Sequence, residues 1–189
     1  MENKERIKKS KRLKTIDIAY VGIFVALITV CSWISIPLAV PITLQTMAVC
    51  ITAGLLGTKK SVIAVISYIL LALIGVPVLS GFSSGIGVVF GITGGYLVGF
   101  IFTALIVGSM VKLLGKKVWV YAVSMFLGIA VCYAFGTAWF VVYNNHNSAD
   151  ATTIGAALSM CVVPFIIPDL VKIAVATLLC KRLAKHVKA

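Results

Sequence analysis

Asp169 and Lys172 are two charged side chains inside an otherwise apolar stretch of the sequence, residues 155–180. A charged side chain at the centre of a membrane helix costs about 2.5–3.5 kcal/mol on insertion scales, so it needs a partner, a cavity or a ligand. At a spacing of three residues, the two side chains share one face of a helix. One acceptor and one donor can then bind the same polar molecule, which indicates a binding site. The alternative is an internal salt bridge that only fixes helix packing.

Pro164 and Pro168 interrupt this stretch just before the charged pair. Proline removes a backbone hydrogen bond, and a membrane tolerates this where the backbone lines a cavity or is covered by protein. Proline also suits the first turn of a helix, where the helix dipole favours the negative charge of Asp169. At 1.5 Å per residue, about 13 Å of helix separates Lys172 from Lys181. We therefore expect a site in the middle to outer half of the bilayer, loaded from outside.

Uncharged polar and aromatic residues could complete this site. Thr43, Gln45 and Thr46 enter the second apolar segment at the same membrane level, although Gln45 could equally cap or bridge helices. Tyr133 and Trp139 flank a glycine in the fifth segment, nearly on one face, and aromatic rings beside a glycine can form a flat slot for a ring. An interfacial aromatic belt or ordinary core packing would use the same two residues.

The segment 75–95 is rich in glycine and includes Gly91 and Gly94. Glycines let a backbone approach a ligand closely and expose its amides. The segment lacks the GKS or GKT sequence and the strand–helix context of a phosphate-binding loop. We expect it to form a lid or wall over the site; the alternative is an outer loop without a role.

Small residues form one face of the first apolar segment, at Ala19, Gly22 and Ala26. Such a face permits close contact between helices. It could serve the chain's own bundle or dock another protein.

The composition sets the class of protein in which these residues act. Of the 189 residues, 61% are hydrophobic and 12% are charged, which is typical of a membrane protein. We predict an all-α membrane protein with six transmembrane helices, at 16–36, 43–57, 61–76, 91–114, 118–143 and 155–180. The second and third segments are short for a span that needs about 20 residues.

The basic residues alternate with the apolar segments. They precede the first segment, follow the sixth, and occupy the connections between the second and third and between the fourth and fifth. The positive-inside rule then places both termini in the cytoplasm, and Lys172 is the exception to the pattern. We expect a basic cytoplasmic amino-terminal arm (1–15), a six-helix membrane substrate-binding domain (16–180) and a basic cytoplasmic tail (181–189). The net charge of +12 fits contact with anionic membrane lipid and argues against nucleic acid as a partner, because it forms no single basic face.

Neither metal nor catalytic chemistry is indicated. The five cysteines are scattered through the apolar segments without metal-ligand spacing, and we expect them to be small buried hydrophobes. Asp169 is the only acid expected at depth, and no Ser–His or His–Glu arrangement accompanies it. We therefore expect no cofactor, no metal site and no enzyme activity. A channel is a further alternative.

Four motifs, in order along the chain, resemble the BioY family, the biotin-binding S-components of energy-coupling-factor (ECF) vitamin transporters. They are Pro41-Ile42-Thr43-Leu44-Gln45-Thr46, Gly75-Val76-Pro77-Val78 continued by Gly91-x-Thr93-Gly94-Gly95-Tyr96, Tyr133-x-x-Gly136-Thr137-x-Trp139, and Pro164-Phe165 followed by Asp169-x-x-Lys172. The chain departs from the family at Ile167-Pro168, where Pro-Gly is usual, and at Ile92, Phe82 and Ser84.

The resemblance implies a multi-pass protein of a bacterial cell membrane that captures biotin outside the cell and performs no chemistry. Transport would need an ECF transmembrane coupling protein, meeting the Ala19–Gly22–Ala26 face, and two ATPase subunits, because this chain has no P-loop. Asp169 and Lys172 would meet the polar ends of biotin and Tyr133 or Trp139 its rings. The remaining contacts would come from Thr43, Gln45, Gly91 and Gly94. The nearest alternative is a solitary carrier for biotin or another small vitamin.

Overall fold

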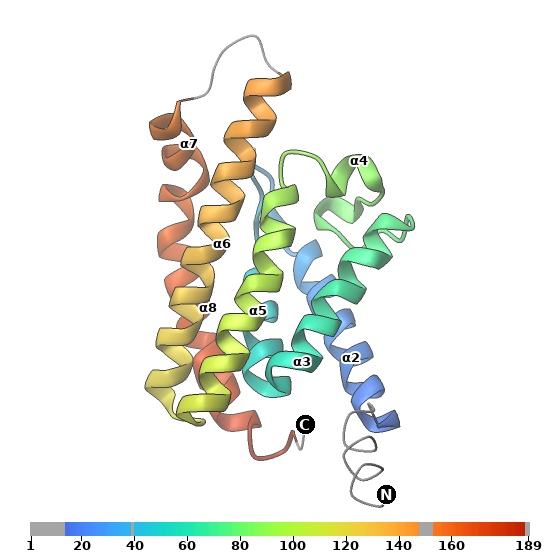
Figure 1. Ribbon diagram of the computed structural model, residues 1–189, viewed down its shortest axis with the longest axis vertical. Coiled ribbons are helices and arrows are strands. Elements are labelled where there is room, and N and C mark those ends of the chain that lie inside the picture. The colour runs from blue at the N-terminus through green and yellow to red at the C-terminus, as the bar shows by residue number, and fades with distance from the viewer. Residues whose placement is uncertain (1–13, 39, 148–152, 188–189) are drawn as a thin grey trace, which may run out of the picture.

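The computed structural model describes residues 14–38, 40–147 and 153–187, which form one bundle of helices (Figure 1). The long helices are α2 (Thr15–Trp33), α3 (Gln45–Leu73), α5 (Gly94–Leu114), α6 (Val118–Asn147) and α8 (Val163–Leu183). The shorter elements are β1 (Ser35–Ile36), β2 (Ile42–Thr43), η1 (Ser80–Phe82), α4 (Ile86–Val89) and α7 (Ile154–Cys161). Within the described residues, 5 helical stretches are long and apolar enough to cross a membrane. The all-helical membrane class is therefore confirmed.

The predicted second and third segments are joined in one element, α3. The structure therefore has five candidate spans, whereas the sequence predicted six. The element is broken at Gly57, whose backbone has φ 72° and ψ 176°. Glycine tolerates this left-handed φ at no steric cost. The two arms of α3 consequently run at an angle to each other (Figure 1), and Lys59 and Lys60 follow the break directly.

The start of α2, the end of α8, the bend of α3 and the α5–α6 turn all lie at one end of the bundle (Figure 1). Apart from Lys172, the described lysines and arginine belong to these four places: Lys14, Lys59, Lys60, Lys112, Lys116, Lys117, Lys181, Arg182 and Lys185. We call this the basic end. Most of the predicted basic arm, residues 1–13, lies outside the described residues. The two strands, α4 and α7 lie at the opposite end.

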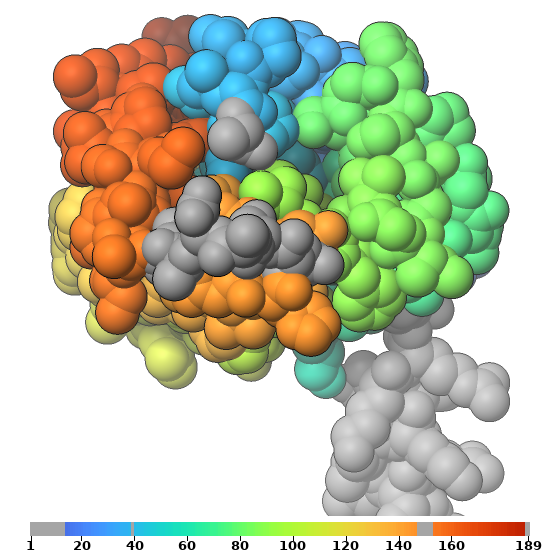
Figure 2. Space-filling model, turned by 90° about the horizontal axis from the view of Figure 1, so that it is seen from above, coloured from blue at the N-terminus to red at the C-terminus, as the bar shows by residue number. Residues whose placement is uncertain are grey.

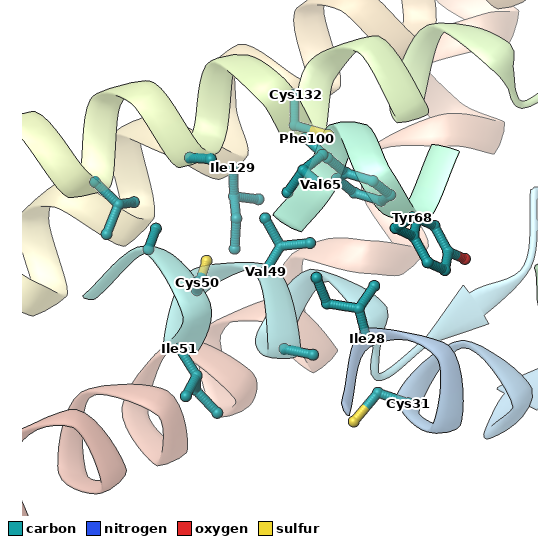
Figure 3. Packing of buried hydrophobic residues seen from close by; sticks show 14 of the residues in the cluster. Ile28, Cys31, Val49, Cys50, Ile51, Val65, Tyr68, Phe100, Ile129 and Cys132 are labelled. Atoms are coloured by element: carbon teal, nitrogen blue, oxygen red, sulfur yellow. The ribbon is translucent and has the colours of Figure 1, made fainter. Parts of the chain in front are cut away.

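The core lies where α2, α3, α5 and α6 meet (Figure 3). Ile28, Val49, Val65 and Tyr68 are at most 1% exposed, and Phe100 is 5% exposed. All five cysteines are free and buried, as the sequence predicts. Many large apolar side chains also point outward, as expected of helices that face lipid.

Glycines set how closely the central helices approach one another. A Cβ added to Gly99 on α5 would lie 2.8 Å from the Cys132 Sγ on α6, and one added to Gly108 would lie 2.6 Å from the backbone N of Thr58 on α3. Small residues permit this backbone proximity between membrane helices. α5 is thereby held between α3 and α6, and its side chains are fixed in position relative to both helices.

Candidate functional site

The charged pair lies inside α8, and Asp169 is not in the first turn of the helix as the sequence predicted. The last span is interrupted earlier than expected, at Val162, whose φ of −123° and ψ of −54° separate α7 from α8. Pro164 lies in the first turn of α8, and Pro168 remains inside the helix without ending it. Asp169 is 3% exposed and Lys172 is 5% exposed. The Lys172 Nζ lies 2.6 Å from the Asp169 Oδ1. Two buried charges thus neutralise each other, which a low-dielectric interior requires.

Two other helices bring hydroxyl groups to this pair. Tyr133 of α6 donates its hydroxyl to the Asp169 Oδ2 at 2.5 Å. Thr46 of α3 donates to the Asp169 Oδ1 at 3.3 Å and accepts from the Lys172 Nζ at 3.3 Å. The network therefore joins three helices, and both carboxylate oxygens have donors.

A second chain of hydrogen bonds fixes the polar residues at the start of α3. The β1–β2 pairing, in which Ser35 faces Thr43, places the Thr43 side chain, and its Oγ1 accepts from the backbone N of Gln45 at 3.2 Å. The Gln45 Nε2 donates to the Tyr68 hydroxyl at 2.9 Å, which in turn donates to the Val78 carbonyl at 3.0 Å. These hydrogen bonds connect the first arm of α3 to the second arm and to the glycine-rich segment.

These residues line a pocket with about 690 Å³ of space not filled by protein atoms, part of it open to the surroundings. Its polar lining includes Thr43, Gln45, Thr46, Tyr133, Asp169 and Lys172. Its apolar lining includes Val40, Leu79, Val88, Leu97, Phe100, Ile129 and Phe165. The pocket suits a molecule with polar groups on an apolar body.

The glycine-rich segment forms one wall of the pocket, through Leu79, Ser80, Val88 and Thr93. It is held to the bundle by several bonds. The Ser32 Oγ donates to the Val78 carbonyl at 2.5 Å, and the backbone N of Gly85 donates to the Ala72 carbonyl at 2.7 Å. Figure 2 shows this end of the molecule, with the segment (green) beside the β1–β2 region (blue). Whether it also moves as a lid stays a prediction.

Phe82 holds an unusual position in this wall. Its φ of 56° makes it the one non-glycine residue with a positive φ among the described residues. Its ring stacks on Trp33 at a centroid distance of 4.8 Å, and the Trp33 Nε1 donates to the Pro77 carbonyl at 3.0 Å. The stack holds the ring where the backbone is in a region that favours glycine.

The structure brings together five of the predicted ligand-binding residues and leaves three apart. Asp169, Lys172, Tyr133, Thr43 and Gln45 line the pocket. Trp139, Gly91 and Gly94 are not among the lining residues.

Trp139, Gly91 and Gly94 contact one another at the start of α5. The Trp139 Nε1 donates to the Gly91 carbonyl at 2.9 Å, and a Cβ on Gly94 would lie 3.2 Å from the same Nε1. Trp139 lies almost two turns along α6 from Tyr133, so the two rings do not form a shared slot. Ligand contact by these three residues stays a prediction.

Aromatic residues that the sequence did not predict as ligand contacts complete the pocket. Tyr96 of α5 and Phe165 of α8 line it. Gly136 packs directly against the Tyr96 ring, so its place in the aromatic motif reflects room for that ring. The spacing of Gly136 from Tyr133 indicates a close aromatic contact, but it does not show that the contacting ring is Tyr96 on α5.

The small-residue face of α2 is uncovered. Ala19, Gly22 and Ala26 are exposed, and a Cβ added to Gly22 would meet no atom within 4 Å. Gly22 and Ala26 line a groove whose other side is formed by Leu70 and Leu71 of α3. Among the described residues, the chain's own bundle therefore does not use this face for close packing.

Comparison with known proteins agrees with the motifs. The sequence model of the BioY family matches residues 4–189. The biotin transporter BioY of Thermotoga maritima is 42% identical over 166 residues, covering 87% of this chain and 93% of that protein. The probable biotin transporter BioY of Pyrococcus horikoshii is 34% identical over 90% of this chain and 98% of its own length.

A solved structure supports the same assignment. The S-component for biotin from an ECF-type ABC transporter superposes with a TM-score of 0.81 at 28% identity, covering 98% of this chain and 95% of that one. The chain belongs to the BioY family, and the resemblance inferred from its motifs is confirmed.

Proposed function

We propose that this protein captures biotin in the Asp169–Lys172 pocket and delivers it as the S-component of an ECF transporter. The observation that carries the proposal is the buried charge pair. Asp169 and Lys172 stand 2.6 Å apart at the polar side of a pocket that is otherwise largely apolar. The relatives are named biotin transporters.

The chemistry of the pocket matches that of biotin. The ureido group has two N–H donors and a polarised oxygen, and an ionised carboxylate offers about four acceptor positions. Asp169 can therefore accept a ureido N–H beside the donors it already binds. Lys172 can donate to the ureido oxygen or to the valerate carboxylate. Tyr96, Phe100 and Phe165 offer apolar surface for the fused rings.

The proposed orientation places the basic end in the cytoplasm and the pocket in the outer half of the membrane. The positive-inside rule supports this orientation, because the basic connections all lie at one end. The two arms of α3 then count as separate spans that meet at Gly57, giving six spans and two cytoplasmic termini. The membrane is the cell membrane of a bacterium.

Transport requires partners of a defined kind. An ECF transmembrane coupling protein docks on the uncovered Ala19–Gly22–Ala26 face, and two ATPase subunits supply the energy. Uptake measured in vesicles with and without the partner complex tests this dependence. Uptake without the complex would identify a solitary carrier instead.

Isothermal calorimetry on the purified full chain tests the binding step. We expect one biotin per chain. Biotin methyl ester identifies the end that Lys172 meets, because only the free acid has a carboxylate to pair with the ammonium group. Absence of binding by a folded protein, together with no biotin retained during purification by mass spectrometry, would refute the proposed function.

A further inference from the structure

The basic end carries a hollow that the proposed function does not use. It lies between the bend of α3 and the end of α5, with about 800 Å³ of space not filled by protein atoms, part of it open to the surroundings. Four lysines line it: Lys59, Lys60, Lys112 and Lys116. They come from two connections far apart in the sequence, so the hollow is a product of the fold.

The fold brings these lysines together through two glycines. Gly57 breaks α3 and turns the chain so that Lys59 and Lys60 follow at the bend. Gly108 allows α5 to approach Thr58 closely, because any Cβ there would lie 2.6 Å from the backbone N of Thr58. The bend of α3 and the last turns of α5 are thereby fixed side by side, with cationic side chains from both.

The lysines are not all neutralised by the protein. The Lys60 Nζ pairs with the Asp17 Oδ1 at 2.6 Å, and Asp17 also accepts from the backbone N of Lys14. Lys59, Lys112 and Lys116 are exposed, and no salt bridge to them is found among the described residues. The hollow is also lined by Thr58, whose hydroxyl lies 3.4 Å from the Ser109 Oγ. Three uncompensated cations around one hydroxyl are suited to a phosphate group.

Exposed apolar side chains lie close in sequence to the lysines of the hollow. Leu113 is 79% exposed, Leu114 46% and Trp119 54%, and each lies within three residues of Lys112 or Lys116 in the sequence. In a membrane protein, tryptophan and lysine next to the end of a span lie at the lipid headgroup level. A ligand here therefore meets cations at its polar group and apolar surface beside it.

We propose that this hollow binds the phosphate headgroup of an anionic phospholipid, with Lys59, Lys112 and Lys116 as the contacting cations. The inference depends on insertion of the chain in a membrane and not on biotin binding. It assigns a lipid site to a defined surface, whereas general attraction of the basic end to an anionic membrane would depend only on total charge.

Native mass spectrometry of the full chain, titrated with phosphatidylglycerol in detergent, tests the proposal. The variant K59Q/K112Q/K116Q removes three charges from the hollow. The control K181Q/R182Q/K185Q removes three charges from the same end without touching the lining. We expect phosphatidylglycerol binding to weaken about tenfold or more in the first variant and less than about threefold in the control. Phosphatidylcholine should bind far more weakly to the wild type.

Other arms of the experiment separate the alternatives. Equal losses in both triple variants, or no loss in either, would overturn the proposal in favour of general surface attraction. Glycerol 3-phosphate or inorganic phosphate binding as tightly as phosphatidylglycerol would overturn the lipid assignment and identify a soluble ligand. If the triple variant fails to fold, the single variants Lys59→Gln and Lys112→Gln decide, each expected to bind the lipid several-fold more weakly. Biotin affinity serves as the folding control, because the biotin pocket lies among other residues.

Discussion

Tyr133 and Lys172 bind opposite oxygens of the same carboxylate. The Tyr133 hydroxyl donates to the Asp169 Oδ2 at 2.5 Å, and the Lys172 Nζ lies 2.6 Å from the Oδ1. Together with Thr46 of α3, these side chains hold Asp169 from three helices at the lining of the pocket. Under the proposed function, a ligand N–H would meet a carboxylate that is already oriented, which lowers the entropy lost on binding.

The first prediction concerns the charged pair itself. Asp169→Asn and Lys172→Ala should each weaken biotin binding more than about tenfold, because an unpaired buried polar group costs about 1–3 kcal/mol and a charged one more. Because the two side chains bind each other, the double variant should lose less than the sum of the two single losses. Calorimetry on the three variants and the wild type measures this. Wild-type affinity in folded single variants would reduce the pair to a structural bridge.

Tyr133 is expected to act through Asp169. Tyr133→Phe keeps the ring and removes the donor to Oδ2, so biotin affinity should fall by about 1–3 kcal/mol, the usual cost of a buried acceptor left without its partner. Tyr20→Phe on α2, a partly buried residue outside the pocket lining, is the matched control and should bind normally. An unchanged affinity in Tyr133→Phe would show that the hydroxyl is not needed.

The glycine-rich wall is expected to lose mobility when biotin binds. Gly87 offers a labelling position, because a Cβ there would meet no atom within 4 Å, and the five native cysteines are buried. A spin label on Gly87→Cys should become less mobile at saturating biotin, while one on Leu113→Cys at the basic end should not respond. Identical spectra with and without biotin at position 87 would argue for a fixed wall.

Bulky residues on the small face of α2 should separate binding from transport. Gly22→Leu and Ala26→Trp should leave biotin affinity unchanged and abolish uptake with the partner complex, because a large side chain keeps two helices apart. Ala174→Leu, at an exposed position on α8, is the control for added bulk on the lipid-facing surface. Full uptake in the α2 variants would place the coupling protein elsewhere.

Gly136 should tolerate no side chain. A Cβ there would overlap the Tyr96 ring, and overpacking of this kind typically costs about 1–3 kcal/mol. Gly136→Ala should therefore lower the thermal midpoint and, by displacing Tyr96 from the pocket lining, weaken biotin binding. Gly155→Ala, where a Cβ would meet nothing within 4 Å, should do neither. Thermal unfolding in detergent followed by calorimetry distinguishes the two variants.

The sequence alone determined the class of protein, the approximate spans and the charged pair. A run of apolar residues long enough for the bilayer and broken by lysines is visible without a structure, and four of the predicted segments match α2, α5, α6 and the α7–α8 pair closely. Asp169 and Lys172 stand out for the same reason, because a charge at depth needs a partner, a cavity or a ligand. The motifs then gave the family, which the comparisons confirm.

Only the tertiary structure decided which residues meet. In a membrane helix the lipid-facing and core-facing sides are both apolar, so the sequence pattern does not show which side points inward. Trp139 therefore looked equivalent to Tyr133, yet it packs on the start of α5 while Tyr96 and Phe165 line the pocket. The lysine-lined hollow at the α3 bend likewise depends on the approach of two helices at Gly57 and Gly108, which no local pattern specifies.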